Sequence, residues 1–319
     1  MKTIINKYFS IKESGIITVL VVLQIIAIFA VDNYATLANL QLILRAIPSI
    51  GVLSLGVCIL MIAQEFDLSV GSTYALAPVI GGLLFHQGIN IFLAFGISLI
   101  AGCVIGVING LVTVKGKMPS FIVTMGTMMI FRAASLLLAD GKSVYNVTTP
   151  GLIRLVGGQL GPIPVSAIWF VAFAGVFWAL LNKHNFGSWV FATGGNKKAA
   201  KAMGINTDRV KLISFILTGF MAAFAGLLDA VRITAVGPNQ GNGLALTAIA
   251  AVVIGGTSLG GGKGTIIGTF LGASLLFIIQ DVLLLLRVSS YYFQLLVGTV
   301  IVLAVLLNTI VGRRSSNAL

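Results

Sequence analysis

Residues 63–72 read AQEFDLSVGS, at the junction of two long apolar runs near 42–63 and 70–86. Glu65 and Asp67 in this stretch are two of only eight acidic residues in a chain of 319. A carboxylate at the centre of a membrane helix costs about 2.5–3.5 kcal/mol on an insertion scale. The stretch therefore predicts a break between two spans rather than one continuous helix.

The composition excludes a water-soluble globule. Hydrophobic residues make up 58% of the chain and charged residues only 9%, with a mean hydropathy of +1.07. Soluble domains average about 25% charged residues, and one helical crossing needs roughly 20 apolar residues. We therefore predict an all-α membrane protein, a single transmembrane domain over residues 1–319, with ten spans near 14–31, 42–63, 70–86, 90–114, 119–139, 163–181, 210–230, 244–259, 264–286 and 291–311.

The basic residues are distributed unevenly among the loops. With the N-terminus in the cytosol, 14 of the 20 Lys and Arg residues fall in cytosolic segments, and four fall in external ones, namely Lys142, Arg154, Arg232 and Arg287. Such a bias predicts that both termini are cytosolic. It also accounts for the net charge of +12 without a nucleic-acid partner.

An inverted repeat is compatible with this topology. Spans 2–5 and 7–10 would enter the membrane from opposite sides, as in inverted-repeat transporters. Glycines at 102, 106 and 110 and at 264, 268 and 272 form rows that let helices approach closely. Both rows lie toward the cytosol, whereas a strict inversion would mirror them, so ordinary tight packing explains the glycines at least as well.

The acidic stretch has two interpretations. Asp67 or Ser69 can cap the next span by accepting hydrogen bonds from unpaired backbone N–H groups, where a carboxylate also meets the positive end of the helix dipole. This structural role, at or near the membrane surface and with Gly71 keeping the turn slim, is favoured. The alternative is that Glu65, Asp67, Ser69 and Gly71 line a solute path or gate, because transporters often place broken helices there.

The one sizeable cytosolic loop, residues 182–209, contains the stretch GGNKKAAKAMGIN (194–206). It predicts a short helix with Asn196 as N-cap and Gly204 just past the C-terminus. A helix of two turns is not stable alone. It therefore needs a partner surface, either lipid headgroups or a soluble protein.

Catalytic and metal sites are not expected. The loops offer no cluster of His, Cys, Asp and Glu with metal-ligand spacing. The glycine-rich stretch GGTSLGGGKGT (255–265) fails as a phosphate loop, because Thr257 occupies the position of the opening glycine and Gly264 replaces the required Ser or Thr. We expect neither enzymatic activity nor a cofactor of its own.

Four stretches carry a family resemblance: DLSVGS (67–72), ATGGNKKAAKAMGI (192–205), AIAAVVIGGTSLGGGKGTIIGT (248–269) and VSSYYFQLLVGTVIVLAVLLN (288–308). Together they resemble the permease subunits of bacterial ABC importers for ribose, xylose, galactose and related compounds. The resemblance implies a ten-helix, multi-pass permease of the bacterial inner membrane, surrounded by lipid.

The same resemblance implies several partners. They are a second permease subunit, identical or different, two cytosolic ATPase subunits that carry ATP and Mg²⁺, and an external binding protein, periplasmic or lipid-anchored, that delivers solute. It also implies that the loop segment is the helix that couples the permease to the ATPase, formed by Asn196, Lys197, Lys198, Ala199, Ala200, Lys201, Ala202, Met203, Gly204 and Ile205.

Two departures from the family pattern leave the solute open. The usual acidic ELDAIAA is ALTAIAA here, so Ala245 and Thr247 replace both acids, and Glu65 in QEFDLSVG is an added acid. A pentose, hexose, polyol, furanone signal or nucleoside all fit.

Polar residues within or near the spans are candidates for the solute path, although each could instead make an interhelical hydrogen bond. These candidates are Asn109, Thr124, Thr127 and Gln280. The alternative function is an ion-coupled secondary transporter of a small polar solute, which would require intramembrane acids that face a cavity. The few candidate acids for it are Asp229 and Asp281, toward external span ends, and Glu65 and Asp67, near a cytosolic one.

Overall fold

The computed structural model describes residues 13–316, with side chains to residue 306. Ten main helices make up the bundle: α2 (Ser14–Ala30), α3 (Leu37–Ile62), α4 (Val70–His86), α5 (Ile91–Gly116), α6 (Ser120–Leu138), α8 (Val165–Asn182), α11 (Thr207–Ile233), α12 (Leu244–Ile254), α13 (Ile266–Leu285) and α14 (Ser290–Ser316). The prediction of a helical membrane protein is confirmed, and each expected span overlaps one of these helices.

Six of the helices in the described residues are long and apolar enough to cross a membrane: α3, α5, α6, α8, α11 and α13. Helices α2, α4 and α12 are apolar but shorter, and α14, 27 residues long, is apolar over Ser290–Leu306, the part whose side chains the structure describes. Length and composition therefore support six crossings directly. The count of ten remains a prediction.

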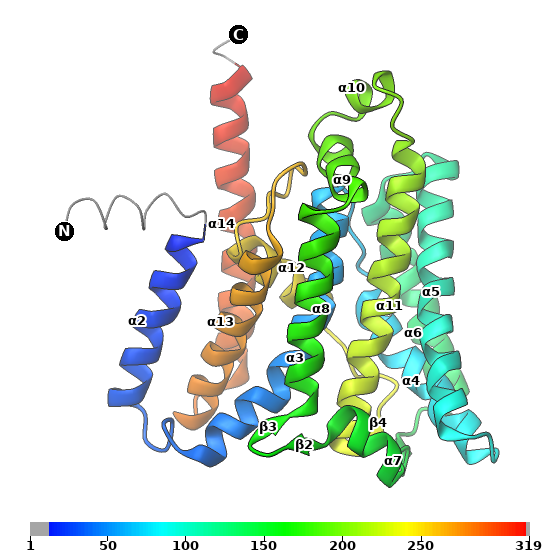
Figure 1. Ribbon diagram of the computed structural model, residues 1–319, viewed down its shortest axis with the longest axis vertical. Helices are drawn as coiled ribbons and strands as arrows, with labels where there is room; N and C mark the ends of the chain where they lie inside the picture. The colour runs from blue at the N-terminus through cyan, green and yellow to red at the C-terminus, as the bar shows by residue number, and fades with distance from the viewer. Residues whose placement is uncertain (1–12, 317–319) are drawn as a thin grey trace.

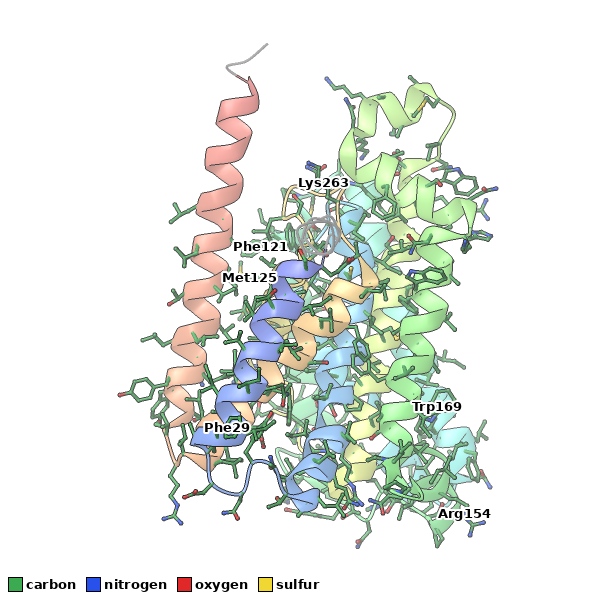
Figure 2. The ribbon with its side chains drawn as sticks, turned by 60° about the vertical axis from the view of Figure 1, so that its left-hand side comes forward. Phe29, Phe121, Met125, Arg154, Trp169 and Lys263 are labelled. Carbon is green, nitrogen blue, oxygen red and sulfur yellow. The ribbon has the colours of Figure 1, made fainter. Side chains whose placement is uncertain are left out.

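The helices alternate in direction between two ends of the bundle (Figure 1). One end carries the short helices α9 (Asn185–Gly195) and α10 (Lys197–Ala202) and the α12–α13 turn. We call it the basic end, because its turns hold Lys117, Lys183, Lys263 and the three lysines of α10. Figure 2 shows Lys263 at this end and Arg154 at the opposite one.

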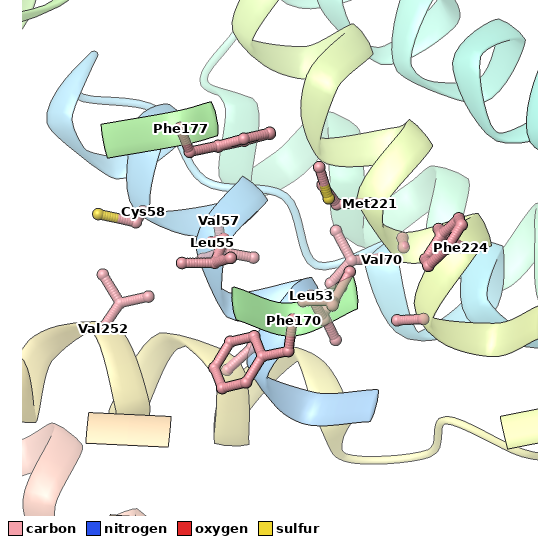
Figure 3. Close-up of a cluster of buried hydrophobic side chains, with 14 of the residues drawn as sticks. Leu53, Leu55, Val57, Cys58, Val70, Phe170, Phe177, Met221, Phe224 and Val252 are labelled. Carbon is pink, nitrogen blue, oxygen red and sulfur yellow. The ribbon is translucent and has the colours of Figure 1, made fainter. Parts of the chain in front are cut away.

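Helices α3 and α11 form the centre of the bundle. Within the most apolar stretch of 18 residues, 78% of the α3 stretch and 72% of the α11 stretch are buried, whereas only 22% is buried in α6 and in α8. Figure 3 shows Leu53, Leu55 and Val57 of α3 packed near Phe170 of α8 and Met221 of α11. Outer side chains are apolar yet uncovered: Phe29 on α2 is 87% exposed and points away from the bundle (Figure 2). Such a surface suits lipid.

Packing in the two halves is equivalent. Helix α3 packs on α13 as α11 packs on α5, and α4 contacts α5 and α6 as α12 contacts α13 and α14. Figure 1 shows α3 and α11 running in opposite directions. The glycine rows do not follow this equivalence, because Gly102 and Gly106 face α11, whereas Gly268 and Gly272 face α12.

The opposite end has short non-helical elements that the all-helical prediction did not include. Strand β1 (Val144–Tyr145) pairs with β4 (Ala235–Val236), and β2 (Gln159–Leu160) pairs with β3 (Ile163–Pro164), both antiparallel. Helix α7 (Pro150–Leu152) and the π-helix η1 (Ile153–Gly157) lie between β1 and β2. These elements close the end of the bundle around α4, α8 and α11.

Candidate functional site

The helix break, residues 63–69, separates α3 from α4. Gln64 adopts φ of +64°, and the last carbonyl of α3, that of Ile62, accepts a hydrogen bond of 2.8 Å from the backbone N–H of Gly262 in the α12–α13 turn. Gly194 of α9 also lies against that carbonyl, since a Cβ on Gly194 would be 1.7 Å from the Ile62 oxygen. The end of α3 is thus held by two segments of the basic end.

Asp67 is buried, with 2% of its surface exposed. Its Oδ1 accepts from the backbone N–H of Ser69 at 2.8 Å and from the Ser69 hydroxyl at 2.7 Å, and its Oδ2 accepts from Asn109 Nδ2 at 3.1 Å. Asn109 Nδ2 also lies 2.7 Å from Ser69 Oγ. The sequence placed this carboxylate at or near the membrane surface. In the structure it is enclosed between the break and α5, and the backbone N–H from which it accepts belongs to Ser69, the residue that precedes α4. The Ser69 side chain itself forms no capping bond to any residue that the structure describes.

The break is also held by α6. The backbone N–H of Phe66 donates to Ser120 Oγ and that of Leu68 to Thr124 Oγ1, each at 3.1 Å. Thr124 Oγ1 in turn donates to the Ser120 carbonyl at 2.7 Å, and Thr127 Oγ1 to the Thr124 carbonyl at 3.3 Å. Asn109 and Thr124 therefore satisfy the backbone and the carboxylate of the break in this structure.

A charged cleft of about 390 Å³ opens beside the break at the basic end. Its walls include Glu65, Lys117, Lys211 and the α10 lysines 197 and 201, together with Asp208. Glu65 forms an ion pair with Lys211 of α11, and both side chains are nearly buried. Asp208 lies 3.4 Å from Lys197 Nζ and 3.6 Å from Lys201 Nζ, in half-exposed pairs.

The short loop helix predicted from 194–206 is present as α10. Asn196 Oδ1 accepts from the N–H of Ala199 at 3.0 Å, and Gly204 has φ of +83° just past the helix. Ala200 is 1% exposed, so it packs within the chain and does not share an outer face with Ala199 and Ala202. Met203, at 69%, is the most exposed of the large apolar side chains of this loop, followed by Trp189 at 45%.

A second cleft, which we call the polar cleft, has a volume of about 620 Å³ and lies between α12, α13 and α14. Its polar lining residues are Asn242, Thr247, Gln280, Ser290 and Gln294, and apolar side chains such as Phe293 and Val297 complete it. Of the four sequence candidates for a solute path, Gln280 lies here, Asn109 and Thr124 lie at the break, and Thr127 lies one turn along α6. The structure does not bring the four together.

Residues of the polar cleft missed by the sequence argument are Asn242, Ser290 and Gln294. Asn242 Oδ1 accepts from Arg132 of α6 at 2.9 Å, which gives this arginine within a predicted span a polar partner. The sequence contained part of the signal for this cleft. Gln294 is the fourth residue of the last predicted span, and it is the same residue type as Gln280, which was chosen from the preceding span. Thr247 was noted only as a departure from a family pattern.

Asp229 and Asp281 each have hydrogen-bond partners within the protein. Asp229 of α11 accepts from Ser49 at 3.3 Å and from Gln240 Nε2 at 2.8 Å, and it forms an ion pair with Arg232. Asp281 accepts from Asn39 Nδ2 at 3.0 Å. All four acids considered for an ion-coupled transporter, namely Glu65, Asp67, Asp229 and Asp281, thus have protein partners. Among the described residues, no group of three His, Cys, Asp or Glu side chains could hold a metal ion.

One known family model and several named relatives match most of the chain. Residues 39–305 match the model of the permease component of branched-chain amino acid transport systems. The ribose import permease RbsC of Escherichia coli (strain K12) is 34% identical over 308 residues, covering 95% of each chain. RbsC of Bacillus subtilis (strain 168) is 38% identical over 290 residues, covering 91% of this chain and 90% of the relative.

A third relative has a different printed solute. The autoinducer 2 import system permease LsrC of Yersinia pestis (strain Pestoides F) is 34% identical over 292 residues, covering 88% of this chain and 81% of the relative. Similar permeases thus carry names that refer to two different solutes.

Proposed function

Because the chain belongs to the family of permease components of transport systems matched over residues 39–305, we propose that it forms the membrane path of an ATP-driven importer for a sugar or sugar-like solute. It is a transport subunit rather than an enzyme. The observation that carries the solute class is the near full-length similarity to ribose import permeases from two organisms. A furanone-type signal is the second solute class, supported by the similarity to LsrC.

The proposed assembly has three kinds of partner. A second permease subunit, a pair of ATP-binding subunits and an external binding protein complete an importer, and ATP with Mg²⁺ binds to the ATPase subunits. The apolar, uncovered surface of the outer helices supports a multi-pass position in a membrane, and we propose that this is the bacterial inner membrane. For such an importer, we propose ten crossings with both termini in the cytosol, so that the basic end faces the cytosol, in accord with the positive-inside bias.

An inverted repeat of α3–α6 and α11–α14 accounts for the equivalent packing of the two halves and for the opposite directions of α3 and α11 in Figure 1. In transporters of this kind, solute sites lie at the interface between repeats, beside interrupted helices. The helix break and the shortened α12 (Leu244–Ile254) are the interrupted elements here.

We place the solute path along the polar cleft rather than at the break. Hydroxyl-rich solutes need side chains that both donate and accept hydrogen bonds, and Asn and Gln amides do both. Asn242, Gln280 and Gln294 are exposed to the cleft, whereas Asn109 and Thr124 are fully buried against the break, to which Asn109 Nδ2 and Thr124 Oγ1 are bonded; the Asn109 Oδ1 atom has no partner in the part of the chain that the structure describes. A second permease subunit across the open side of the cleft would complete the path.

Energy enters through α10 in this proposal. The helix lies at the outer surface of the basic end (Figure 1), directly before α11, the central helix of the bundle. Its exposed residues Ala199, Ala202 and Met203 form a small apolar surface for an ATPase groove, and Lys197, Lys198 and Lys201 surround it. Surface charge pairs are worth about 0–1 kcal/mol each, so the apolar contacts decide the affinity.

The test is transport by the reconstituted importer. The chain, with its ATPase and binding protein in proteoliposomes, should take up labelled ribose only when ATP is present, and unlabelled xylose, galactose or autoinducer 2 should rank as competitors. An ionophore that dissipates ion gradients should leave uptake intact. Uptake that needs an ion gradient and not ATP would overturn the importer and favour the ion-coupled alternative.

A further inference from the structure

The ion pair between Glu65 and Lys211 joins two segments that are far apart in the sequence. Its side chains are 12% and 8% exposed. In the described part of the chain, the other ion pairs have at least one side chain exposed by 40% or more. A buried pair of this kind adds little net stability over an apolar pair of the same shape, so stability alone gives little reason for placing it here.

The chain segments before and after α10 both contact the helix break. Gly194, three residues before α10, lies against the last carbonyl of α3. Lys211, nine residues after α10, binds Glu65. Asp208 links the α10 lysines to the first turn of α11 in the same cleft. A displacement of α10 therefore acts on the break through the contact on each side.

The start of α4, directly after the break, contacts the segment that lines the polar cleft. Gly71 in the first turn of α4 lies so close to the carbonyl of Gly241 that a Cβ there would be 2.5 Å from that oxygen. Asn242, the next residue, lines the polar cleft and holds Arg132 of α6. Two backbone segments in van der Waals contact without intervening side chains leave little room for independent movement.

We propose that the Glu65–Lys211 pair is a positioning element that transmits movement of α10 through the helix break to the polar cleft. The inference rests on the proposed function, which supplies the ATP-driven movement. Neither residue touches solute. The pair fixes the position of the break relative to α11, so that α10, α11 and the start of α4 move as one body.

The test separates transmission from folding. Glu65→Gln or Lys211→Met alone leaves a buried charge unpaired, so each lowers the amount of folded protein. The double variant Glu65→Gln/Lys211→Met removes both charges and should recover membrane level and ATPase assembly. The double variant should still lose transmission. The exchanged pair Glu65→Lys/Lys211→Glu should recover both the membrane level and the transmission. A surface control is Asp140→Asn/Lys142→Met, which removes an exposed pair at the opposite end.

Transmission is measured without a solute. Gln280→Cys in a Cys103→Ser background reports access to the polar cleft through its rate of labelling by a water-soluble thiol reagent, in the complex with the ATPase and with or without ATP and vanadate. We expect the nucleotide-dependent change in rate to fall by about fivefold in the double variant, the scale of a coupling of directly contacting residues. The exchanged pair and the surface control should show the full change.

The outcomes are distinguishable. If the parent importer shows no ATP-dependent uptake, the proposed function fails. If uptake depends on ATP but the labelling of Gln280→Cys does not change with nucleotide, no movement reaches the polar cleft and the positioning role is overturned. If the parent responds and the double variant responds equally, or the exchanged pair does not recover, the positioning role is overturned. If the double variant does not reach the membrane, Glu65→Asp decides, because its shorter side chain keeps the charge but loosens the tie: an unchanged response would overturn the proposal, and a reduced one would support it.

Discussion

At the scale of single residues, Asn109 contributes to the stability of the break. Its amide nitrogen lies within hydrogen-bonding distance of both Asp67 and Ser69. Asn109→Ala leaves a buried carboxylate short of a donor, and it should lower the free energy of unfolding by about 1–3 kcal/mol. The thermal stability of the purified permease measures this effect. Thr127→Ala, which removes a hydroxyl bonded within its own helix, is the matched control.

The same variant distinguishes structure from path. We expect Asn109→Ala to leave the apparent KM for transport unchanged, because the side chain lies outside the polar cleft. A normal melting temperature combined with a raised KM would return Asn109 to the solute path.

Gln280 should behave in the opposite way. Its side chain is exposed to the polar cleft, so Gln280→Ala should leave thermal stability intact. Loss of one solute hydrogen bond is worth about 0.5–1.5 kcal/mol, which should raise the apparent KM two- to tenfold in the uptake assay. Gln159→Ala, an exposed glutamine in β2 at the opposite end, should leave KM unchanged. If Gln280→Ala had the same apparent KM as the control Gln159→Ala, Gln280 would not be part of the path.

Sequence reasoning identified Asn109, Thr124 and Gln280 by one property, a polar side chain in an apolar run. It could not separate them, because the separation depends on partners far away in the chain. Thr124 meets a backbone N–H 56 residues distant, and Glu65 meets Lys211 across 146 residues. Such pairings follow from helix packing, whereas a cap or a turn follows from neighbours in the sequence.

At the scale of elements, the local signals were sufficient for α10. The N-cap of Asn196 and the positive φ of Gly204 agree with the sequence prediction, because both depend on residues within one turn. The orientation of the helix did not follow from the sequence: of its three alanines, Ala200 is 1% exposed and packs within the chain, whereas Ala199 and Ala202 are exposed. Likewise hydropathy predicted spans at α2, α4 and α12 without showing that these helices are shorter than the rest, because hydropathy does not measure where a helix ends.

The coupling role of α10 is tested on its outer face. Ala202→Glu places a charge on the apolar surface proposed for the ATPase, and it should reduce assembly and ATP-driven uptake while the bundle remains folded. Gly204→Val opposes the left-handed backbone, at a cost of about 1–2 kcal/mol, and should have the same effect by altering the helix exit. Co-purification with the ATPase and uptake per ATP hydrolysed measure both.

Ala200→Glu is the informative comparison for these variants. Its side chain would be forced into the interior of the loop, so it should lower thermal stability as well as coupling. If Ala202→Glu and Gly204→Val both assemble and transport at the unmodified rate, α10 does not carry energy into the permease.

At the scale of the whole molecule, topology is the prediction with the widest consequence. The 14-to-4 distribution of basic residues and the alternating helix directions in Figure 1 place the basic end in the cytosol if all ten helices cross. A phosphatase or fluorescent reporter fused after Leu319 should then report a cytosolic C-terminus. A tag inserted in 143–160 should be accessible from outside intact cells.

Both reporters on the same side would mean that an odd number of the helices α8, α11, α12, α13 and α14 fails to cross. The short α12, of 11 residues, would be the first to reconsider. If α12 did not cross, the equivalence of the two halves would lose its inverted orientation, because α13 and α14 would then run in the same directions as α5 and α6.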